Sequence, residues 1–345
     1  MRQIFFILFI TGYLISPFSA FPQAENYPSY ATLALEGINA TLNENYFFAG
    51  DRFKKIISLD SLNPAGYFFL GALYQAEMMD YESDFKEEEF YSALEKAIQL
   101  AQKRISCGSS TSWDYLYLGN SYGYLGVYKA RKGSWWSAFR NAMEAKSAFK
   151  KAVELDSTLY DAYLGLGSYH YWTSHFTKTF AWLPFFADER EKGKEELKLA
   201  AEKSLFSKAA AWNALIWIHI KEKDYSQAIE LAKGLQEEYP EGKLFLWAIA
   251  TAYYEKYDWE NAIEYYNLIS KKLKTNPGKN HYNLIECKYY IAQSYFNFGD
   301  FAQCIEACQE ALSFKLDSKT KERQEDKLDK LEELLKKSLK ITGRK

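Results

Sequence analysis

The sequence predicts an all-α protein, a right-handed superhelical solenoid of about seven helical hairpins with a C-terminal capping helix. Three observations lead to this fold class. A motif centred on glycine recurs along the chain, only 7 prolines occur in 345 residues, and the last segment carries leucines at helical spacing. Short units that cannot each bury an apolar face must stack on their neighbours, and stacked helical hairpins form a solenoid.

The recurring motif reads aromatic-x-x-Leu-Gly-x-x-Tyr or His. It occurs as YFFLGALY, YLYLGNSY and YLGLGSYH, and the central glycines, Gly71, Gly119 and Gly167, are 48 residues apart both times. A residue without a side chain at this position lets the first helix of a hairpin approach the second closely. Looser copies of the motif begin at Trp212, Leu246 and Lys288.

A second motif marks the start of the second helix in the later hairpins. It occurs as KDYSQAIELA, YDWENAIEYY and GDFAQCIEAC, with the small residues Ala228, Ala262 and Cys304 spaced by 34 and 42. The aspartate before the aromatic residue is expected to end the turn and cap the helix. The segment NYFFAGDRF around Ala49 fits an earlier copy.

Together these motifs resemble the tetratricopeptide repeat, a helix–turn–helix unit of about 34 residues. The resemblance covers roughly residues 28–315, with longer repeats over about 64–207 and regular repeats over about 208–315. It implies a superhelix whose first helices line a concave surface that binds an extended peptide or a helix of another protein. The longer repeats carry about 14 extra residues each, which are expected near 76–90, 127–136 and 171–187.

The register of the motifs also predicts where the helices begin. The first helices are expected near Pro28, Pro64, Ser112, Leu159, Lys208, Lys243 and Asn280. A last helix is predicted over 319–340, because its leucines fall on one stripe: Leu328, Leu331, Leu335 and Leu339. Such a helix suits the cap that a solenoid needs at its end, and the alternative is a membrane-surface or partner-binding helix.

A narrower likeness lies between Asp161 and Trp247. This part looks like an exported bacterial-type tetratricopeptide protein, and it is similar to the inclusion-body-clearance branch of the family. The similarity to that branch rests on a short element before a helix, here Leu183, Pro184, Phe186, Asp188, Arg190 and Gly193. The branch is intracellular and non-enzymatic, whereas this chain carries an export pattern, so the likeness bears on architecture.

The N-terminal segment 1–20 has the pattern of a secretory signal peptide. A short positive region ending at Arg2 precedes the apolar run Ile4–Ile15, and small residues follow up to Ala20. The run is too short to span a bilayer comfortably, and an uncleaved anchor is the alternative. No cysteine follows that would support a lipoprotein anchor. The sequence therefore predicts an exported protein, periplasmic or secreted, whose mature chain has no transmembrane segment.

The composition and motifs argue against catalysis, cofactors and nucleic acid. The net charge of −2 lacks the basic surplus with which proteins neutralise phosphates. No phosphate-binding loop, dinucleotide fingerprint or zinc motif is present. His170 and His175 are five residues apart, which does not place them on one helix face, so no metal site is expected there. The sequence thus predicts a non-enzymatic interaction scaffold of the cell envelope, with an unidentified protein or peptide partner.

Two sets of aromatic residues are candidates for binding. The first set lies on predicted first helices, at positions that the repeat motif does not fix: Trp113, Tyr117, Tyr171, Trp217, Tyr254 and Tyr290. Packing between repeats is the alternative for each of them. The second set lies in the aromatic insert 171–187: Phe176, Phe180, Trp182, Phe185 and Phe186. This insert would suit a ligand- or lipid-binding component of an envelope transport or assembly system, with peripheral membrane contact.

Two further features have a structural and a functional interpretation. Cys304 and Cys308 share a helix face and are expected to pack as small apolar residues rather than form a redox or metal pair, although a bond from Cys287 to Cys304 is possible. The acidic run from Asp80 to Phe90 is expected to be a solvated loop leading into a helix N-terminus. Docking of a basic partner or a cation is the alternative for this run.

Overall fold

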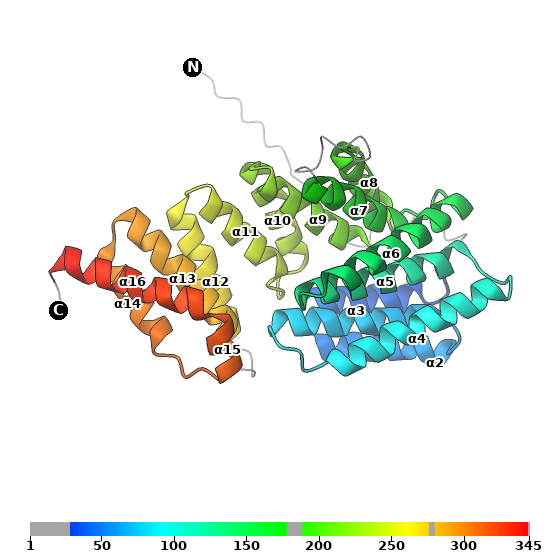
Figure 1. Cartoon of the computed structure of the whole chain (residues 1–345), viewed down its shortest axis with the longest axis horizontal. Coiled ribbons are helices and arrows are strands. Elements are labelled where there is room, and N and C mark those ends of the chain that lie inside the picture. Colours follow the sequence, from blue (N-terminus) through cyan, green and yellow to red (C-terminus); the bar gives the residue numbers. More distant parts are fainter. Residues whose placement is uncertain (1–27, 178–187, 276–279, 344–345) are drawn as a thin grey trace, which may run out of the picture.

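The computed structural model describes residues 28–177, 188–275 and 280–343, and the predicted signal peptide lies outside them. Within these ranges the chain forms sixteen helices and no strand (Figure 1). Fourteen of them pair as seven hairpins: α1 (Ala31–Leu42) with α2 (Tyr46–Leu59), α3 (Pro64–Asp80) with α4 (Glu87–Ser106), α5 (Ser112–Arg131) with α6 (Trp135–Leu155), α7 (Ala162–Thr177) with α8 (Arg190–Lys203), α9 (Lys208–Lys221) with α10 (Tyr225–Glu238), α11 (Leu244–Glu255) with α12 (Trp259–Thr275), and α13 (His281–Phe298) with α14 (Phe301–Leu312). The prediction of an all-α solenoid of about seven hairpins is confirmed.

The hairpins form one continuous, curved stack. Each second helix packs on the first helix of the following hairpin. From α1 to α11, successive first helices also touch one another, whereas contacts between successive second helices are sparse among the described residues. The first helices therefore line the inner side of the curve and the second helices its outer side.

The glycines of the first motif mark the closest helix crossings, as the sequence predicted. A Cβ added at Gly71 would meet the side chain of Leu94, and one added at Gly119 would lie 2.7 Å from the ring of Phe149. At the third copy a Cβ on Gly167 would lie 2.7 Å from the carbonyl oxygen of Gly193, and a Cβ on Gly193 would lie equally close to that of Gly167. The backbones of α7 and α8 thus touch, which explains the glycine at position 193.

The second motif caps helices as expected. Asp224 and Asp300 precede α10 and α14, and each accepts a hydrogen bond from the backbone N–H three residues later. Asp258 does the same before α12. These carboxylates satisfy N–H groups that have no partner within the helix and also favour its positive end.

The extra residues of the longer repeats mostly lengthen helices rather than form insertions. The helices α4, α5 and α6 have 20, 20 and 21 residues, whereas α9 and α10 have 14 each. Of the expected insertion at 127–136, only a short turn remains between α5 and α6. Most of the third expected insertion, 178–187, lies outside the described residues.

The C-terminal segment forms two helices where the sequence predicted one over 319–340. The short α15 (Ser318–Arg323) ends at Gln324, and α16 (Glu325–Thr342) follows at once. Gln324 is 1% exposed, and its amide nitrogen donates to the carbonyl of Tyr282 and to Glu286. These buried contacts fix the interruption between α15 and α16 at Gln324. Leu331 of the predicted stripe is fully buried, and α16 covers α13 and α14 as the expected cap.

A polar seam joins the first two hairpins to the last two hairpins and α15. In Figure 1 the blue-to-cyan and the yellow-to-red hairpins lie on opposite sides of the molecule. The seam runs between acidic residues of the first part and basic or amide residues of the second, which are Glu44, Asp80, Glu82 and Asp84 on one side and Lys243, Asn280, Asn283, Lys319 and Arg323 on the other. We call this set the edge seam. The superhelix therefore completes a turn and touches itself.

The edge seam corrects one expectation from the sequence. The acidic residues Asp80, Glu82 and Asp84 were expected to be a solvated loop, and they instead bind cations of the same chain. Asp84 accepts from Lys319 at 2.8 Å, and Glu82 pairs with Arg131 at 2.7 Å as well as with Arg323. Lys319 lies 235 residues after Asp84 in sequence, so local composition could not reveal this partner. The glutamates that follow do occupy the first turn of α4, as expected.

Candidate partner-binding surface

The chain's own side chains fill the inner side of the first hairpins. Phe206, from the turn between α8 and α9, stacks on Tyr30 and meets Phe69 edge-on at 5.5 Å. Asp161 fixes this turn, because its carboxylate accepts hydrogen bonds from the backbone N–H groups of Leu205, Phe206 and Ser207 at 2.8 to 3.0 Å. A carboxylate that accepts three backbone donors holds a turn strongly.

Two of the six first-helix candidates, Trp113 and Tyr117, lie in this filled region, and a third, Tyr171, is buried in another cluster between α7, α8 and α9. Tyr117 is 1% exposed, its hydroxyl lies 2.8 Å from that of Tyr30, and Trp113 stacks on it at 6.2 Å. Tyr171 is also 1% exposed and donates to Glu222. Tyr117 and Tyr171 thus have no surface for a partner and pack between repeats, which was the alternative for them. Trp113 is half-buried against Phe206.

Two other candidates meet on the inner side of the last hairpins. The rings of Tyr254 on α11 and Tyr290 on α13 lie 4.8 Å apart, edge to face. Around them lie further aromatic residues in ring contact, and the whole set, which we call the α11–α13 aromatic cluster, is Trp247, Tyr254, Tyr257, Trp259, Tyr266, Tyr289 and Tyr290. Tyr266 is its buried base, since it is 1% exposed and stacks on Tyr290 at 5.0 Å.

The hydroxyl groups of Tyr254 and Tyr290 are available for binding. Both side chains are partly exposed, and neither hydroxyl has a hydrogen-bond partner among the described residues. Burial, and after it the nearby Glu286, raises the pKa of Tyr290 to about 12. Burial together with the neighbouring Tyr289 also raises the pKa of Tyr254. Both groups therefore stay protonated at neutral pH and can donate a hydrogen bond.

Two amide oxygens without a partner lie one helical turn from candidate residues. The side-chain oxygen of Gln293 is buried and unpaired, and residue 293 follows Tyr290 by three positions on α13. The side-chain oxygen of Asn213 is likewise buried and unpaired, four positions before Trp217 on α9. Residues three or four apart lie on one helix face. Buried acceptors normally have partners, and the described residues leave these two oxygens without one. The sequence motifs do not indicate them.

The aromatic insert is mostly outside the described residues. This applies to Phe180, Trp182, Phe185 and Phe186, and the side chain of Phe176 is likewise not described. The ligand-binding interpretation of 171–187 therefore stays a prediction.

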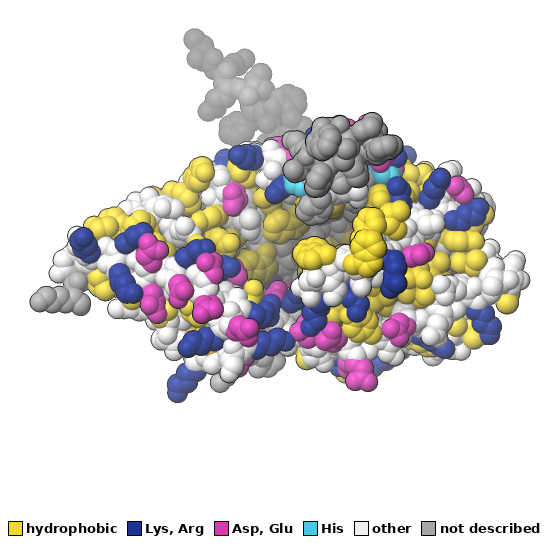
Figure 2. Space-filling model, viewed as in Figure 1, with side chains coloured by type: hydrophobic (Ala, Val, Ile, Leu, Met, Phe, Trp, Pro, Cys, Tyr) yellow, Lys and Arg dark blue, Asp and Glu magenta, His cyan; other side chains and the backbone are white. Residues whose placement is uncertain are grey.

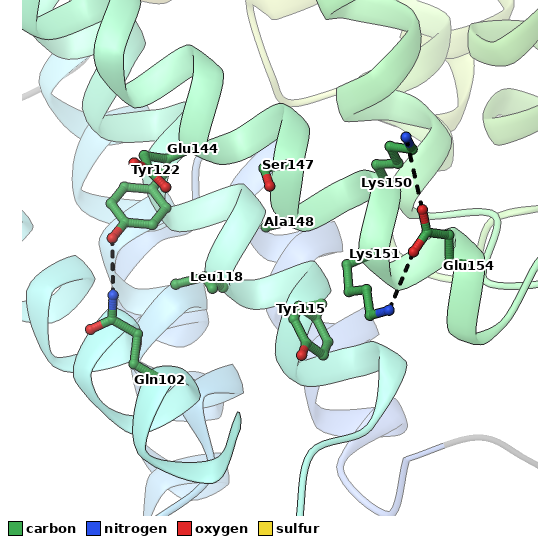
Figure 3. A pocket seen from close by; sticks show the side chains of 10 residues that line it. All are labelled: Gln102, Tyr115, Leu118, Tyr122, Glu144, Ser147, Ala148, Lys150, Lys151 and Glu154. Carbon is green, nitrogen blue, oxygen red and sulfur yellow. Dashed lines mark hydrogen bonds and ion pairs between the residues drawn. The ribbon is translucent and has the colours of Figure 1, made fainter. Parts of the chain in front are cut away.

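Two shallow grooves lie elsewhere on the surface. The larger, about 420 Å³, is formed by α4, α5 and α6 (Figure 3). Its wall carries Lys150 and Lys151, which both approach Glu154, and Gln102, which donates to the hydroxyl of Tyr122. The smaller groove, about 380 Å³, lies between α2 and α3. The sequence did not indicate either groove, because polar residues on the face of a helix also occur on any solvated surface.

The titratable residues singled out in the sequence have structural partners. His170 is 6% exposed, and its Nδ1 lies 2.6 Å from Glu196. Cys287, Cys304 and Cys308 are buried free thiols, and Ser338 of the cap donates to the sulfur of Cys304 at 3.3 Å. Burial raises the pKa of Cys287 to about 12. In the described part of the chain, no three His, Cys, Asp or Glu side chains are grouped to hold a metal ion. None of the described helices has the length and apolar character needed to cross a bilayer.

Comparison with known proteins identifies the fold of the chain. No family model matches the sequence, and no curated protein matches it. Among solved structures, a chain of the APC/C hetero-tetramer Cut9–Hcn1 is similar over 91% of this chain and 53% of that one, with 15% identity and a TM-score of 0.53. The chain has the tetratricopeptide-repeat fold. It spans about half the length of that matched chain.

Other tetratricopeptide-repeat structures are also similar. The C-terminal part of a TPR repeat-containing protein from Cytophaga hutchinsonii covers 83% of this chain and 97% of its own, at 18% identity and a TM-score of 0.43. Yeast Tom70 covers 92% and 66%, at 17% identity and a TM-score of 0.41. At these identities the likeness concerns the fold. Tyr254 and Tyr290 of the α11–α13 aromatic cluster then lie on first helices of a tetratricopeptide-repeat superhelix, and Tyr266, at the base of the cluster, lies on the second helix α12.

Proposed function

We propose that the chain is a non-enzymatic scaffold of the cell envelope that holds an extended segment of a protein partner on the α11–α13 aromatic cluster. The observation that carries this proposal is the pair Tyr254 and Tyr290, whose rings are partly exposed and whose hydroxyls are unpaired among the described residues. Partly exposed aromatic residues with polar ends are the side chains that dominate binding energy at protein interfaces.

The polar groups around the pair suit a peptide backbone. An extended peptide presents N–H groups to acceptors and C=O groups to donors. The hydroxyls of Tyr254 and Tyr290 can accept from such N–H groups and donate to such C=O groups. The curved inner side supports this reading, because solenoids use such concave surfaces for binding. In the similar Cut9–Hcn1 structure the tetramer itself is an assembly of two kinds of chain.

The charges near the pair favour a basic partner residue. Glu255 follows Tyr254 directly, is exposed, and has no ion pair among the described residues. Glu286, one turn before Tyr290, is already held by Lys327 at 2.7 Å. A lysine or arginine of the partner can lie over a tyrosine ring and reach Glu255.

The envelope location rests on the signal-like segment 1–20. Expression of the full chain with a C-terminal tag, followed by cell fractionation and N-terminal sequencing, tests this part separately. Recovery of a chain that begins just after Ala20 in the periplasm or medium is expected. Recovery of an intact chain in the cytoplasm would remove the envelope part of the proposal.

The binding part is tested by affinity purification from the native cells with variants of the full chain. Tyr254→Ala should lower recovery of the partner about tenfold or more. The double variant Tyr254→Phe and Tyr290→Phe keeps the rings and removes only the hydroxyls, so it separates binding from folding. Phe47→Ala is a matched control, since Phe47 is 92% exposed on α2 and lies outside the α11–α13 aromatic cluster. Equal recovery by all these proteins would refute the site.

A further inference from the structure

The outer face of α6 carries an exposed apolar patch that the proposed function does not use. Trp135 and Trp136 are 72% and 81% exposed, and Phe139 and Met143 are 55% and 43% exposed. Trp135, Phe139 and Met143 follow one another at intervals of four, so they form one stripe along the helix. We call these four side chains the α6 patch. Figure 2 shows hydrophobic side chains protruding over α6.

This patch is unusual for a solvent-exposed protein surface. Single exposed apolar residues are common, but adjacent exposed tryptophans within a group of four large apolar side chains indicate an interaction site. The patch protrudes from the start of a helix and lines neither of the two grooves. The patch therefore suits contact with a flat or deformable surface. Among the described residues it offers no pocket into which a partner's side chain could insert.

The charges on α6 itself beside the patch are mainly positive, while Asp84 and Glu87 near the start of the helix are paired with Lys132. Arg140 lies beside it on α6 and has no carboxylate partner among the described residues, and Lys146 continues the apolar stripe one turn later, with its amine over the ring of Tyr169. On the neighbouring helix, Lys129 lies over Tyr91. The only acidic residue among the first sixteen of α6 is Glu144, on its other side, where it lines the larger groove.

We infer that the α6 patch binds the surface of an anionic lipid bilayer. Tryptophan is the residue that prefers the boundary between lipid headgroups and acyl chains, and lysine and arginine beside it attract anionic headgroups. A protein partner for this patch would be expected to need acidic residues around an apolar pocket, and a second copy of the chain offers the same cations and would repel it. The lipid surface satisfies both the apolar and the charged part.

This attachment uses the outer side of the superhelix and leaves the inner side free. α6 is a second helix, whereas Tyr254 and Tyr290 lie on first helices. A chain bound to lipid through α6 can therefore hold its partner at the α11–α13 aromatic cluster at the same time. The two surfaces are independent, so their tests fail independently.

The test uses the full chain with vesicles of phosphatidylcholine alone or of phosphatidylcholine mixed with the anionic lipid phosphatidylglycerol. The first readout is hydrogen exchange, because the apolar N-terminal segment can itself bind vesicles and only a local measurement separates the two. Residues 127–146 should become protected with the anionic vesicles and much less with the neutral ones. Residues 46–59, around Phe47, should not change. No protection at 127–146 would overturn the inference.

The second readout is vesicle flotation of variants. Trp135→Ser with Trp136→Ser should lower the partition coefficient about tenfold or more, and Phe47→Ser should leave it unchanged. Raising the ionic strength several-fold with sodium chloride should weaken the binding of the wild-type chain. Unchanged flotation of the double variant together with unchanged protection at 127–146 would overturn the inference. So would light scattering that shows a dimer which the double variant abolishes, because the patch would then bind a second copy.

Discussion

Lys243 lies in the same buried cluster as Glu44, 199 residues earlier in the chain, and both the backbone N–H and the ammonium group of the lysine bind that carboxylate. The ammonium also reaches Asp80 at 3.1 Å. Burial and the neighbouring Asp80 raise the pKa of Glu44, and Lys243 opposes this shift. One cation thus compensates two carboxylates and ties the beginning of the superhelix to its later part.

Replacement of Lys243 by methionine should open the edge seam. The change leaves Glu44 and Asp80 without their cation, which costs about 3–5 kcal/mol for a buried pair. Small-angle scattering should show a larger radius of gyration, and the midpoint of thermal unfolding should fall. Lys198→Met is the control, because Lys198 forms an exposed pair with Glu202 at 3.9 Å that contributes about 1 kcal/mol or less. Equal effects of both variants would contradict the role of Lys243.

The seam should also weaken in acid through Asp84. Burial raises the pKa of this carboxyl, but hydrogen bonds from Lys319, Lys132 and Tyr128 outweigh it and hold the pKa well below its usual range. A group with a lowered folded pKa stabilises the fold fully above its unfolded pKa of about 3.9, and this contribution is lost gradually as the pH falls from that value through the lower folded pKa. Asp84→Asn should therefore lower the unfolding temperature at pH 7 and lower it by clearly less at pH 2.5. A difference of the same size at both values would show that the carboxylate charge is unimportant.

The glycine pair of α7 and α8 can be tested with a matched control. Gly193→Ala places a methyl group against the backbone of α7, where Tyr171 N and Gly167 O are both 2.7 Å away, and should destabilise the protein by about 1–3 kcal/mol. Gly234→Ala, on α10, meets nothing within 4 Å and should stabilise it by about 0.4–1 kcal/mol. Denaturant unfolding measures both. A neutral Gly193→Ala would contradict the close crossing.

Asp161 should matter because it holds the turn that fills the inner side. Asp161→Ala leaves three N–H groups near Phe206 without an acceptor, each costing about 1–3 kcal/mol when buried. Asp161→Asn keeps one acceptor oxygen, so it should lower the free energy of unfolding clearly less than Asp161→Ala does. Hydrogen exchange at residues 204–207 should rise in the alanine variant. Unchanged exchange there would show that other contacts hold the turn.

The repeat motifs predicted most of the fold because their physical causes are local. Glycine at positions 71 and 119 indicates a close helix crossing, and aspartate before an aromatic residue indicates a helix cap. Helix starts at Ser112 and Lys208 were predicted and lie where expected. The break at Gln324 was not predicted, because its amide is held by α13 rather than by neighbours in sequence.

The edge seam and the available surface could not be predicted in the same way. Whether Asp80 is solvated or contacts Lys243 depends on the total rotation between the seven stacked hairpins. A short stretch of sequence does not determine that total rotation. The same applies to Tyr117 and Tyr171, which have the residue type of a binding surface but lie inside the stack. Tyr254 and Tyr290 share that residue type and stay partly exposed. Geometry alone distinguishes them.

The most direct test of the scaffold account is photocrosslinking from single positions in the native cells. A photoreactive phenylalanine analogue at position 254 should give a covalent adduct with one partner protein, and the same analogue at position 47 should not. Excess unlabelled wild-type chain should compete the adduct away, and the partner should bind the purified Tyr254→Phe, Tyr290→Phe variant more weakly than the wild-type chain. Adduct formation from position 47 but not from position 254 would contradict the account.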